Sequence, residues 1–301
     1  MSDLLESSEE IKKASKKSRK KKSQWPFVVI FVLGLLVLSY PLISRFYYRV
    51  ESTQQVEDFD NEKKKLTRDE IRKRMDLAHA YNRSLNNVIS TDPYVKKQLE
   101  AGRKEYARML EINEQMGHIE IPKIDIDVPI YAGTVEAVLQ KGAGHLEGTS
   151  LPVGGASTHT VITAHSGLPT AKLFTDLSKV KVGDKFFIHN LSQVLAYEVD
   201  QIKTIEPSNF NDLLIVPNRD YATLLTCTPI MINTHRLLVR GHRVPYNPNE
   251  FDKMKKTNKL IFWLKVIGFV LLLILIIWWL YRKIKKKSKK KQAQNTISQG
   301  L

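Results

Sequence analysis

Two long apolar runs lie near the two ends of this 301-residue chain, with a mixed segment between them. Residues 25–44 (WPFVVIFVLGLLVLSYPLIS) carry no charge over 20 positions, and residues 260–281 (LIFWLKVIGFVLLLILIIWWLY) carry one, Lys265. About 20 apolar residues are enough to cross a bilayer core of roughly 30 Å. Trp25 and Tyr281 lie at segment ends, where aromatic side chains contact the membrane interface. The pattern predicts two transmembrane helices, over 25–44 and 260–281.

Basic residues flank each apolar run only on the side toward the chain end. Residues 1–24 hold eight Lys or Arg against four acids, and residues 282–301 hold eight and no acid. The tails therefore supply +12 of the formal charge of +16, which argues for anionic-lipid contacts rather than nucleic-acid binding. The positive-inside rule places both tails in the cytoplasm and residues 45–259 outside it. The first run can also be interpreted as a cleaved signal peptide. We favour an uncleaved anchor, because the run is long and no clear A-x-A site follows.

The segment after the first apolar run repeats apolar residues at helical spacing. These residues fall near i, i+4 and i+7 steps: Leu66, Ile71, Met75, Ala78, Tyr81 and Leu85. Thr67 with Glu70 three positions later resembles a capping box. We expect residues 56–90 to form a helix that rises from the membrane, within an extracytoplasmic helical region over 45–116. Asp92-Pro93 then breaks the helical periodicity.

From about residue 117 the pattern changes to short strands. The strand candidates are rich in β-branched and aromatic residues: HIEIPKIDIDVPIYAG, HTVITAH, DKFFIHN, VLAYEVDQIKTI, ATLLTCT and HRLLVRGHRV. Pro122 and Pro129 are expected to interrupt the first of them.

Few helices are expected among these strands. Residues 134–140 and 170–178 are predicted as short helices or turns. Many short strands with few helices favour a mostly-β barrel or sandwich, here over residues 117–250. Residues 251–259 would then link this domain to the second apolar run.

Cys227 is the one cysteine of the chain, so no intrachain disulfide can form. A lone cysteine is either a small buried apolar residue or a reactive thiol. Cys227 ends the apolar strand ATLLTC, and Pro229 cannot donate to a strand ladder, so the strand is expected to stop there. Arg236 follows nine positions on, at the start of HRLLVRG. A hairpin would place Cys227 and Arg236 on neighbouring strands near the same end.

Eight histidines are candidates for a place beside this cysteine. His165 ends the strand TVITAH and precedes Ser166-Gly167, which places its imidazole at a barrel rim next to a turn. His235 adjoins Arg236 and is the main rival. The other six are interpreted as surface or hydrogen-bonded structural residues: His79, His118, His145, His159, His189 and His242. One cysteine with scattered histidines has no metal-ligand spacing, so no metal centre is expected.

These three residue types suit acyl transfer through a thiol. A thiol attacks as thiolate, and its free pKa of about 8.5 leaves little thiolate at neutral pH. A neighbouring imidazole can take that proton and later protonate a leaving amine. Acyl transfer also develops an oxyanion, which a fixed guanidinium can stabilise. Arginine suits this role because it stays charged and donates in a planar fork.

Two stretches resemble the catalytic segments of sortases. TLLTCTPIMINTHRLLVRGHR is similar to their active-site hairpin, in which an arginine follows a TLxTC strand by nine positions. GAGHLEGTSLPVGGASTHTVITAHSGLPTAKLF is similar to the segment that holds their histidine. Both look most like class C, the pilin-polymerising sortases of Gram-positive bacteria, over roughly residues 60–250. The resemblance implies a closed β-barrel with Cys227 as nucleophile, His165 as general acid and base, and Arg236 as the oxyanion or substrate-positioning group.

The same class implies a lid with an Asp-Pro-aromatic motif, which Asp92-Pro93-Tyr94 matches. Asp92 could pair with Arg236 while Tyr94 covers the sulfur, although such a triplet is also an ordinary turn sequence. One departure concerns the loop beside the cysteine. The family often has Tyr-Gly after the Thr-Pro, whereas this chain has Ile230-Met231, which leaves the shape of this loop and the substrate preference open.

The resemblance implies a cysteine transpeptidase that cleaves an LPXTG-like sorting signal through a thioacyl intermediate and joins pilin subunits by a lysine isopeptide bond. It implies pilin subunits as partners and no metal or organic cofactor. Two alternatives stay open. A cell-wall precursor amine could resolve the intermediate, which would make the protein an anchoring sortase. Alternatively, a non-catalytic membrane-tethered scaffold would treat Cys227 as structural.

Overall fold

The computed structural model describes residues 25–85 and 109–254, together with scattered positions between 256 and 282. Two long helices precede a strand-rich domain with short helical turns. The elements are α2 (Trp25–Lys63), α3 (Arg68–Ser84), β1 (Gln115–Ile121), η1 (Pro122–Ile124), β2 (Ile126–Ala132), α5 (Glu136–Leu139), β3 (Ala143–His145), β4 (Thr158–Thr163), η2 (Leu173–Lys179), β5 (Lys185–His189), β6 (Val194–Ile205), η3 (Asn211–Leu213), β7 (Asp220–Thr228) and β8 (His235–Val244).

Eight strands close into a barrel in the order β1-β2-β3-β4-β7-β8-β6-β5, and β5 pairs with β1 to complete the ring. The β2–β3 and β4–β7 pairs are parallel, whereas the other pairs are antiparallel. Closure leaves none of these strands with an unpaired edge. The expected mostly-β barrel is confirmed, and its parallel β4–β7 pair carries two strand ends to the same side.

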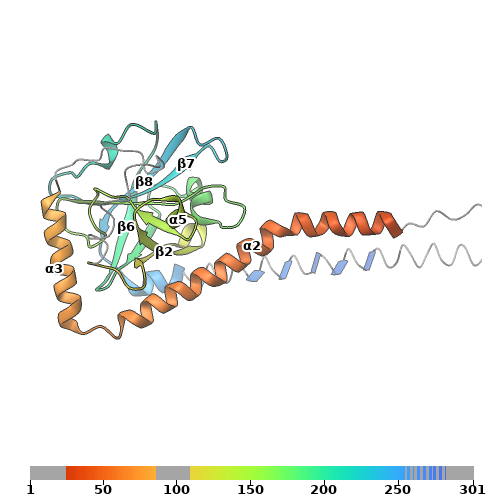
Figure 1. Cartoon of the computed structure of the whole chain (residues 1–301), viewed down its shortest axis with the longest axis horizontal. Coiled ribbons are helices and arrows are strands. Elements are labelled where there is room, and N and C mark those ends of the chain that lie inside the picture. Colours follow the sequence, from red (N-terminus) through yellow and green to blue (C-terminus); the bar gives the residue numbers. More distant parts are fainter. Residues whose placement is uncertain are drawn as a thin grey trace, which may run out of the picture.

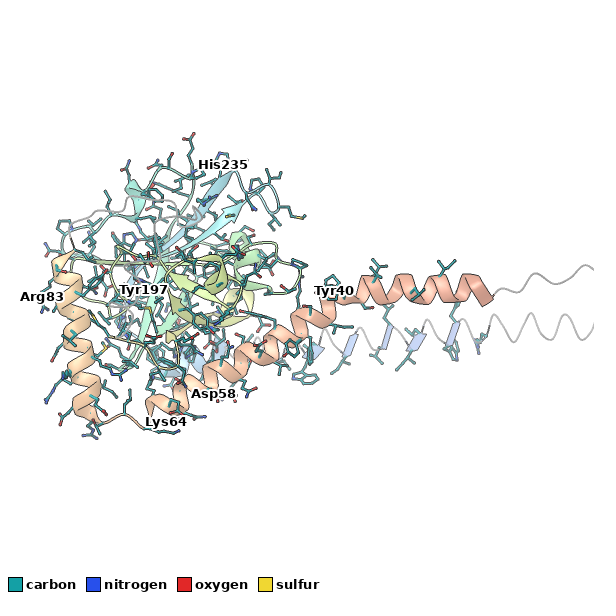
Figure 2. All side chains as sticks on the ribbon, viewed as in Figure 1. Tyr40, Asp58, Lys64, Arg83, Tyr197 and His235 are labelled. Carbon is teal, nitrogen blue, oxygen red and sulfur yellow. The ribbon has the colours of Figure 1, made fainter. Side chains whose placement is uncertain are left out.

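Alternating side chains fill the interior of the barrel. Ile119 and Ile130 lie in the main apolar cluster and are fully buried, as are Leu224 of β7 and Val239 of β8. The ring of Tyr197 also lies inside, stacked on Phe186, and Figure 2 shows it within the barrel. Because side chains alternate along a strand, the neighbours of these residues point to the outer face.

The predicted strands are present, but the limits of some of them differ from the prediction. β6 and β8 have the predicted limits, whereas the barrel begins at Gln115, two residues before the predicted boundary. Pro122 interrupts the first strand as expected, because it opens η1. The prediction for Pro129 was wrong: it lies inside β2, opposite His118 of β1. The three-residue strand β3 was not predicted.

The predicted single helix over residues 56–90 is wrong, because the structure has two helices there. α2 continues from Trp25 to Lys63, and α3 begins at Arg68 after a break. The capping box at the break is confirmed: the Thr67 hydroxyl accepts from the backbone N–H of Glu70, and the Glu70 carboxylate accepts from the backbone N–H of Thr67. A capping box satisfies N–H groups that have no partner within the helix, so it starts a new helix here.

The C-terminal half of α2 and the whole of α3 lie against the barrel (Figure 1). Phe59 of α2 and Met75 and Ala78 of α3 are buried in the main apolar cluster. The Asn82 side-chain amide donates to the carbonyl of Leu151 (3.1 Å) and accepts from its backbone N–H (2.7 Å). The helical region is therefore part of the folded domain.

The N-terminal half of α2 extends well beyond the barrel (Figure 1). Across the described residues, none of the helices combines the length and the apolar character that crossing a bilayer requires. The two spans predicted over 25–44 and 260–281 therefore stay predictions.

After β8 the chain turns into a further helical segment. Residues 248–254 are helical, and Phe251 is buried against Phe187 with ring centroids 4.8 Å apart. The predicted linker over 251–259 thus begins inside a helix that packs on the barrel.

Candidate active site

Three neighbouring strands carry the predicted reacting residues to one end of the barrel. β4 runs parallel to β7 with Thr163 opposite Leu225, and β7 runs antiparallel to β8 with Cys227 opposite Arg236. The alignment of β4 and β7 continues past the last paired residue. The Ala164 N–H donates to the Leu225 carbonyl (3.2 Å), and the Thr226 hydroxyl donates to the Ala164 carbonyl (2.7 Å).

This register brings His165, Cys227 and Arg236 level with one another, in the strand order β4, β7, β8. Strand alternation places all three on the same face. Ala164 belongs to the cluster that fills the barrel, as do Leu224 of β7 and Leu237 of β8, which alternation places on the face opposite Cys227 and Arg236. The three therefore point outward, where they continue a smaller apolar cluster that includes Val161, Leu225 and Leu238.

Cys227 and Arg236 are buried, with 7% and 6% of their surfaces exposed, while the His165 side chain keeps 16%. The site is thus a largely desolvated rim that is still accessible at the imidazole. The Arg236 guanidinium is held by its own hairpin, because Nη1 donates to the carbonyls of Asn233 (3.0 Å) and His235 (3.1 Å). A guanidinium held in this way is pre-organised to meet a developing negative charge.

His235, the rival to His165, points away from the site. It adjoins Arg236 on β8, so alternation directs its side chain to the opposite face. It is exposed, lies near the end of β8 (Figure 2) and contacts the Thr234 hydroxyl through Nδ1 (2.9 Å).

Two further histidines are fully buried, as expected for structural residues. Burial lowers the pKa of His145 and of His159 to about 4, so both are neutral at physiological pH. The His159 ring contacts the Leu214 carbonyl (2.9 Å) and the Thr223 hydroxyl (2.7 Å). Neither is suited to proton exchange with a substrate near pH 7.

Glu136 is a site residue that the sequence did not reveal. Both of its carboxylate oxygens lie 3.2 Å from Nε2 of His165. The residues are 29 positions apart, and a single glutamate in GTVEAVLQKG has no motif or spacing that points to a histidine.

Three further features do not contribute to the described site: the predicted lid, a pocket and metal-ligand groups. The lid motif, Asp92, Pro93 and Tyr94, lies outside the described residues. A pocket of about 630 Å³, lined in part by Arg83, Gly155 and Thr158, lies by the first residue of β4 and so away from the carboxyl-terminal end that carries the site. Among the described residues, no group of three His, Cys, Asp or Glu side chains is arranged to hold a metal ion.

Known proteins are similar to this chain in fold and in sequence. Residues 119–244 match the family model described as the sortase domain. The crystal structure of sortase C-1 from Streptococcus pneumoniae is 69% identical, with a TM-score of 0.62 over 64% of this chain and 100% of that one. Pilus-related sortase C of Group B Streptococcus is 63% identical, with a TM-score of 0.61 over 64% and 97%. Sortase A of Streptococcus agalactiae is 25% identical over 210 residues, which are 68% of this chain and 78% of that protein.

The chain belongs to the sortase family. It is a cysteine transpeptidase of the sortase C type, because solved streptococcal sortases C match it at 54–69% identity. The match to the sortase domain covers the last three residues of β1 and every strand from β2 to β8. It therefore includes the whole row formed by His165, Cys227 and Arg236.

The loop that departs from the family pattern lies beside this row. In this sortase Ile230, Met231 and Ile232 are exposed, at 47%, 83% and 67%. Ile230 packs toward the turn after His165, where a Cβ on Gly167 would lie 2.7 Å from its Cγ2. Gly167 has a φ of +81°, so glycine is favoured there on backbone grounds as well.

Proposed function

We propose that this sortase polymerises pilin subunits outside the cytoplasm, with Cys227, His165 and Arg236 as its catalytic residues. The observation that carries the proposal is the 63% identity to pilus-related sortase C of Group B Streptococcus, over 97% of that chain. The strand register supports the residue assignment, because it aligns a thiol, an imidazole and a guanidinium on one face of adjacent strands.

In the first half-reaction the Cys227 thiolate attacks the threonine carbonyl carbon of an LPXTG-like sorting signal. The carbonyl oxygen becomes an oxyanion, and the guanidinium of Arg236 stabilises it. Collapse of this intermediate breaks the Thr–Gly bond as His165 gives a proton to the leaving glycine amine. The products are a thioacyl enzyme and the released C-terminal segment.

In the second half-reaction a lysine amine of another pilin attacks the thioacyl carbon. His165 takes a proton from the attacking amine, and Cys227 leaves as thiolate. An isopeptide bond forms and the enzyme returns to its starting state. Each cycle consumes one peptide bond and forms one amide.

The proposed site of action is the extracytoplasmic side of the cell membrane, with both chain termini in the cytoplasm. The uncharged run at 25–44 and the basic tails support two membrane anchors. Residues along this part of α2 expose large apolar side chains, among them Ile30 (67%), Val37 (73%) and Leu38 (75%). Such exposure is costly in water and suits a helix in lipid.

The direct test is a polymerisation assay with the full chain in membranes and a candidate pilin. We expect an SDS-resistant ladder whose steps differ by one pilin mass. A single product linked to a cell-wall precursor would favour the anchoring alternative. A chain that forms no product and whose cysteine does not react with thiol-specific electrophiles would favour a scaffold.

We further propose that Asp92, Pro93 and Tyr94 form a lid over Cys227, on the strength of the motif alone. Tyr94→Ala should then speed the alkylation of Cys227 by a thiol-specific electrophile, because it removes the cover from the sulfur. A matched change, Tyr47→Ala on an exposed part of α2, should leave the rate unchanged. Equal rates in wild type and Tyr94→Ala would refute the lid.

A further inference from the structure

The His165 ring has a carboxylate partner that the proposed mechanism does not yet use. Nε2 lies 3.2 Å from each oxygen of Glu136. An ionised carboxylate has no proton to donate, so the imidazole N–H at Nε2 is the donor in this contact. The hydrogen bond at one ring nitrogen determines which nitrogen is left for proton exchange, and here that nitrogen is Nδ1.

The fold delivers Glu136 to this position through a short helix. Val138 and Leu139 of α5 are buried, and Leu139 packs on β3, where a Cβ on Gly144 would lie 3.1 Å from its Cδ2. Gly144 pairs with Thr163 of β4, two residues before His165. The buried face of α5 thus fixes the helix over the end of β4, while its exposed face presents Glu136.

The carboxylate is itself oriented by the same helix. Gln140, one turn after Glu136, donates its side-chain N–H to Oε1 at 2.5 Å. The Glu136 side chain is 54% exposed and the His165 side chain 16% exposed. The contact therefore joins a well-exposed carboxylate to an imidazole that is only partly exposed.

Two hydrogen bonds hold the backbone of the turn that carries His165. The Phe174 N–H donates to the His165 carbonyl (3.0 Å), and the Gly167 N–H donates to the Thr175 hydroxyl (2.9 Å). These bonds fix the turn, whereas the ring orientation depends on two side-chain torsions. A general base works well only when a third group holds it in the reacting geometry.

We propose that Glu136 is the positioning residue for His165, an inference that rests on the proposed function. It holds the Nε2–H side of the ring, so that Nδ1 faces the reacting groups and exchanges the proton with the Cys227 thiol and the leaving amine. Glu136 touches neither substrate nor sulfur in this scheme. Its contribution passes entirely through the imidazole.

The first test compares Glu136→Ala with a matched control. Glu250→Ala also removes an exposed ion-paired glutamate, 46% exposed and 2.8 Å from Lys185, at a place away from the site. We expect Glu136→Ala to lower kcat about tenfold, a fraction of the 10²–10⁴ that general acid–base catalysis supplies, with KM within twofold. The control should keep both constants, and both variants should melt at the wild-type temperature.

The second test asks whether the effect passes through His165. Alkylation of Cys227 by iodoacetamide is measured in wild type, Glu136→Ala, His165→Asn and the double variant. We expect Glu136→Ala to slow alkylation several-fold in the wild-type background and to change nothing further in His165→Asn, since positioning requires the ring.

Equal factors in both backgrounds, or a kcat that stays the same or rises in Glu136→Ala, would overturn the inference. Such a result leaves the proposed function standing if the wild-type chain still forms ladders and Cys227→Ala does not. Failure of the wild-type chain to form ladders would count against the proposed function itself.

Discussion

The outer face of β4, β7 and β8 carries two polar clusters with closely related side chains and different environments. Each cluster takes one residue from β7, one from β8 and one from β4 or the residues just after it: His159, Thr223 and Arg240 near one end, and His165, Cys227 and Arg236 at the other. The apolar cluster that includes Val161, Leu225 and Leu238 lies between them. The comparison indicates how position in the fold distinguishes a structural cluster from the proposed catalytic one.

The first cluster is held by bonds within the protein. Both nitrogens of His159 have internal partners, and burial lowers its pKa to about 4. Arg240 donates through Nε to Asp200 (2.9 Å) and lies over the Tyr221 ring. The histidine of this cluster is therefore neutral, and its arginine is paired with a carboxylate.

The second cluster lies where the strands end, and its histidine is less enclosed than His159, although Cys227 and Arg236 are buried. His165 is two residues past β4 and keeps an accessible ring, and its ring partner, Glu136, is itself exposed. A nucleophilic hydroxyl or thiol also needs a base that can change protonation near neutral pH. The rim cluster has an accessible imidazole level with a thiol, whereas the first cluster has a buried neutral imidazole bonded to a hydroxyl.

The largest expected effect follows from removing the thiol at the rim. Cys227→Ala should lower pilin polymerisation by roughly 10³-fold or more, since no thioacyl bond can form. Its stability should change by only about 1 kcal/mol, because one small side-chain atom is lost. Ladder assays and thermal melts measure the two quantities, and wild-type ladders from this variant would remove Cys227 from the mechanism.

The next largest effect comes from replacing the arginine of each cluster by lysine, which should lower activity in one cluster and not in the other. Arg236→Lys should lower kcat about 10²-fold, because a point charge lacks the planar fork that meets an oxyanion. Arg240→Lys makes the same chemical change in the buried cluster and should keep kcat within about twofold of wild type. Equal losses in the two variants would show that the comparison does not separate catalysis from structure.

A change in the buried cluster should cost stability instead of activity. Thr223→Val keeps the shape but leaves Nε2 of His159 without its hydroxyl partner. An unsatisfied buried polar group costs about 1–3 kcal/mol in the free energy of unfolding. Urea denaturation should show this loss while the folded variant turns over normally. An unchanged midpoint would mean that the bond contributes nothing to stability.

The last expected effect is a difference in pH dependence. His159 binds a proton at about pH 6.5 when unfolded but only near pH 4 when folded, because burial disfavours its charged form. The unfolded state therefore holds more protons between these values, and stability falls as pH drops from 6.5 toward 4, by up to about 1.4 kcal/mol per pH unit for one histidine.

The variant His159→Gln should show a shallower fall in urea midpoint across this range. His145, whose pKa is also lowered to about 4 by burial, remains in the variant and keeps part of the slope. An identical slope in wild type and variant would contradict the interpretation of His159 as a buried neutral residue.

The sequence predicted those parts of the fold that have a strong local pattern. β6 and β8 are long alternating segments and have the expected limits, and the Thr67–Glu70 capping box marks a real helix start. The same box divides the segment expected to be one helix, because a cap begins a new helix rather than continuing one. β3 has three residues, which is too short for an alternating pattern to indicate a strand.

Only those site residues that belong to a sequence motif could be predicted from the sequence. Cys227 and Arg236 pair as the hairpin spacing suggested, and His165 reaches their level through the parallel β4–β7 pair, which spacing alone does not specify. Glu136 was missed, because its contact with His165 depends on how α5 packs on β3. Tertiary packing of this kind has no local signature in the chain.

The central claim is that the thiol at the end of β7 forms an acyl bond with its substrate. Mass spectrometry of the protein trapped with a sorting-signal peptide tests it most directly. The account predicts an adduct with the mass of the peptide up to its threonine, located on Cys227 and lost in Cys227→Ala. An adduct on another residue, or peptide cleavage that proceeds in Cys227→Ala, would contradict it.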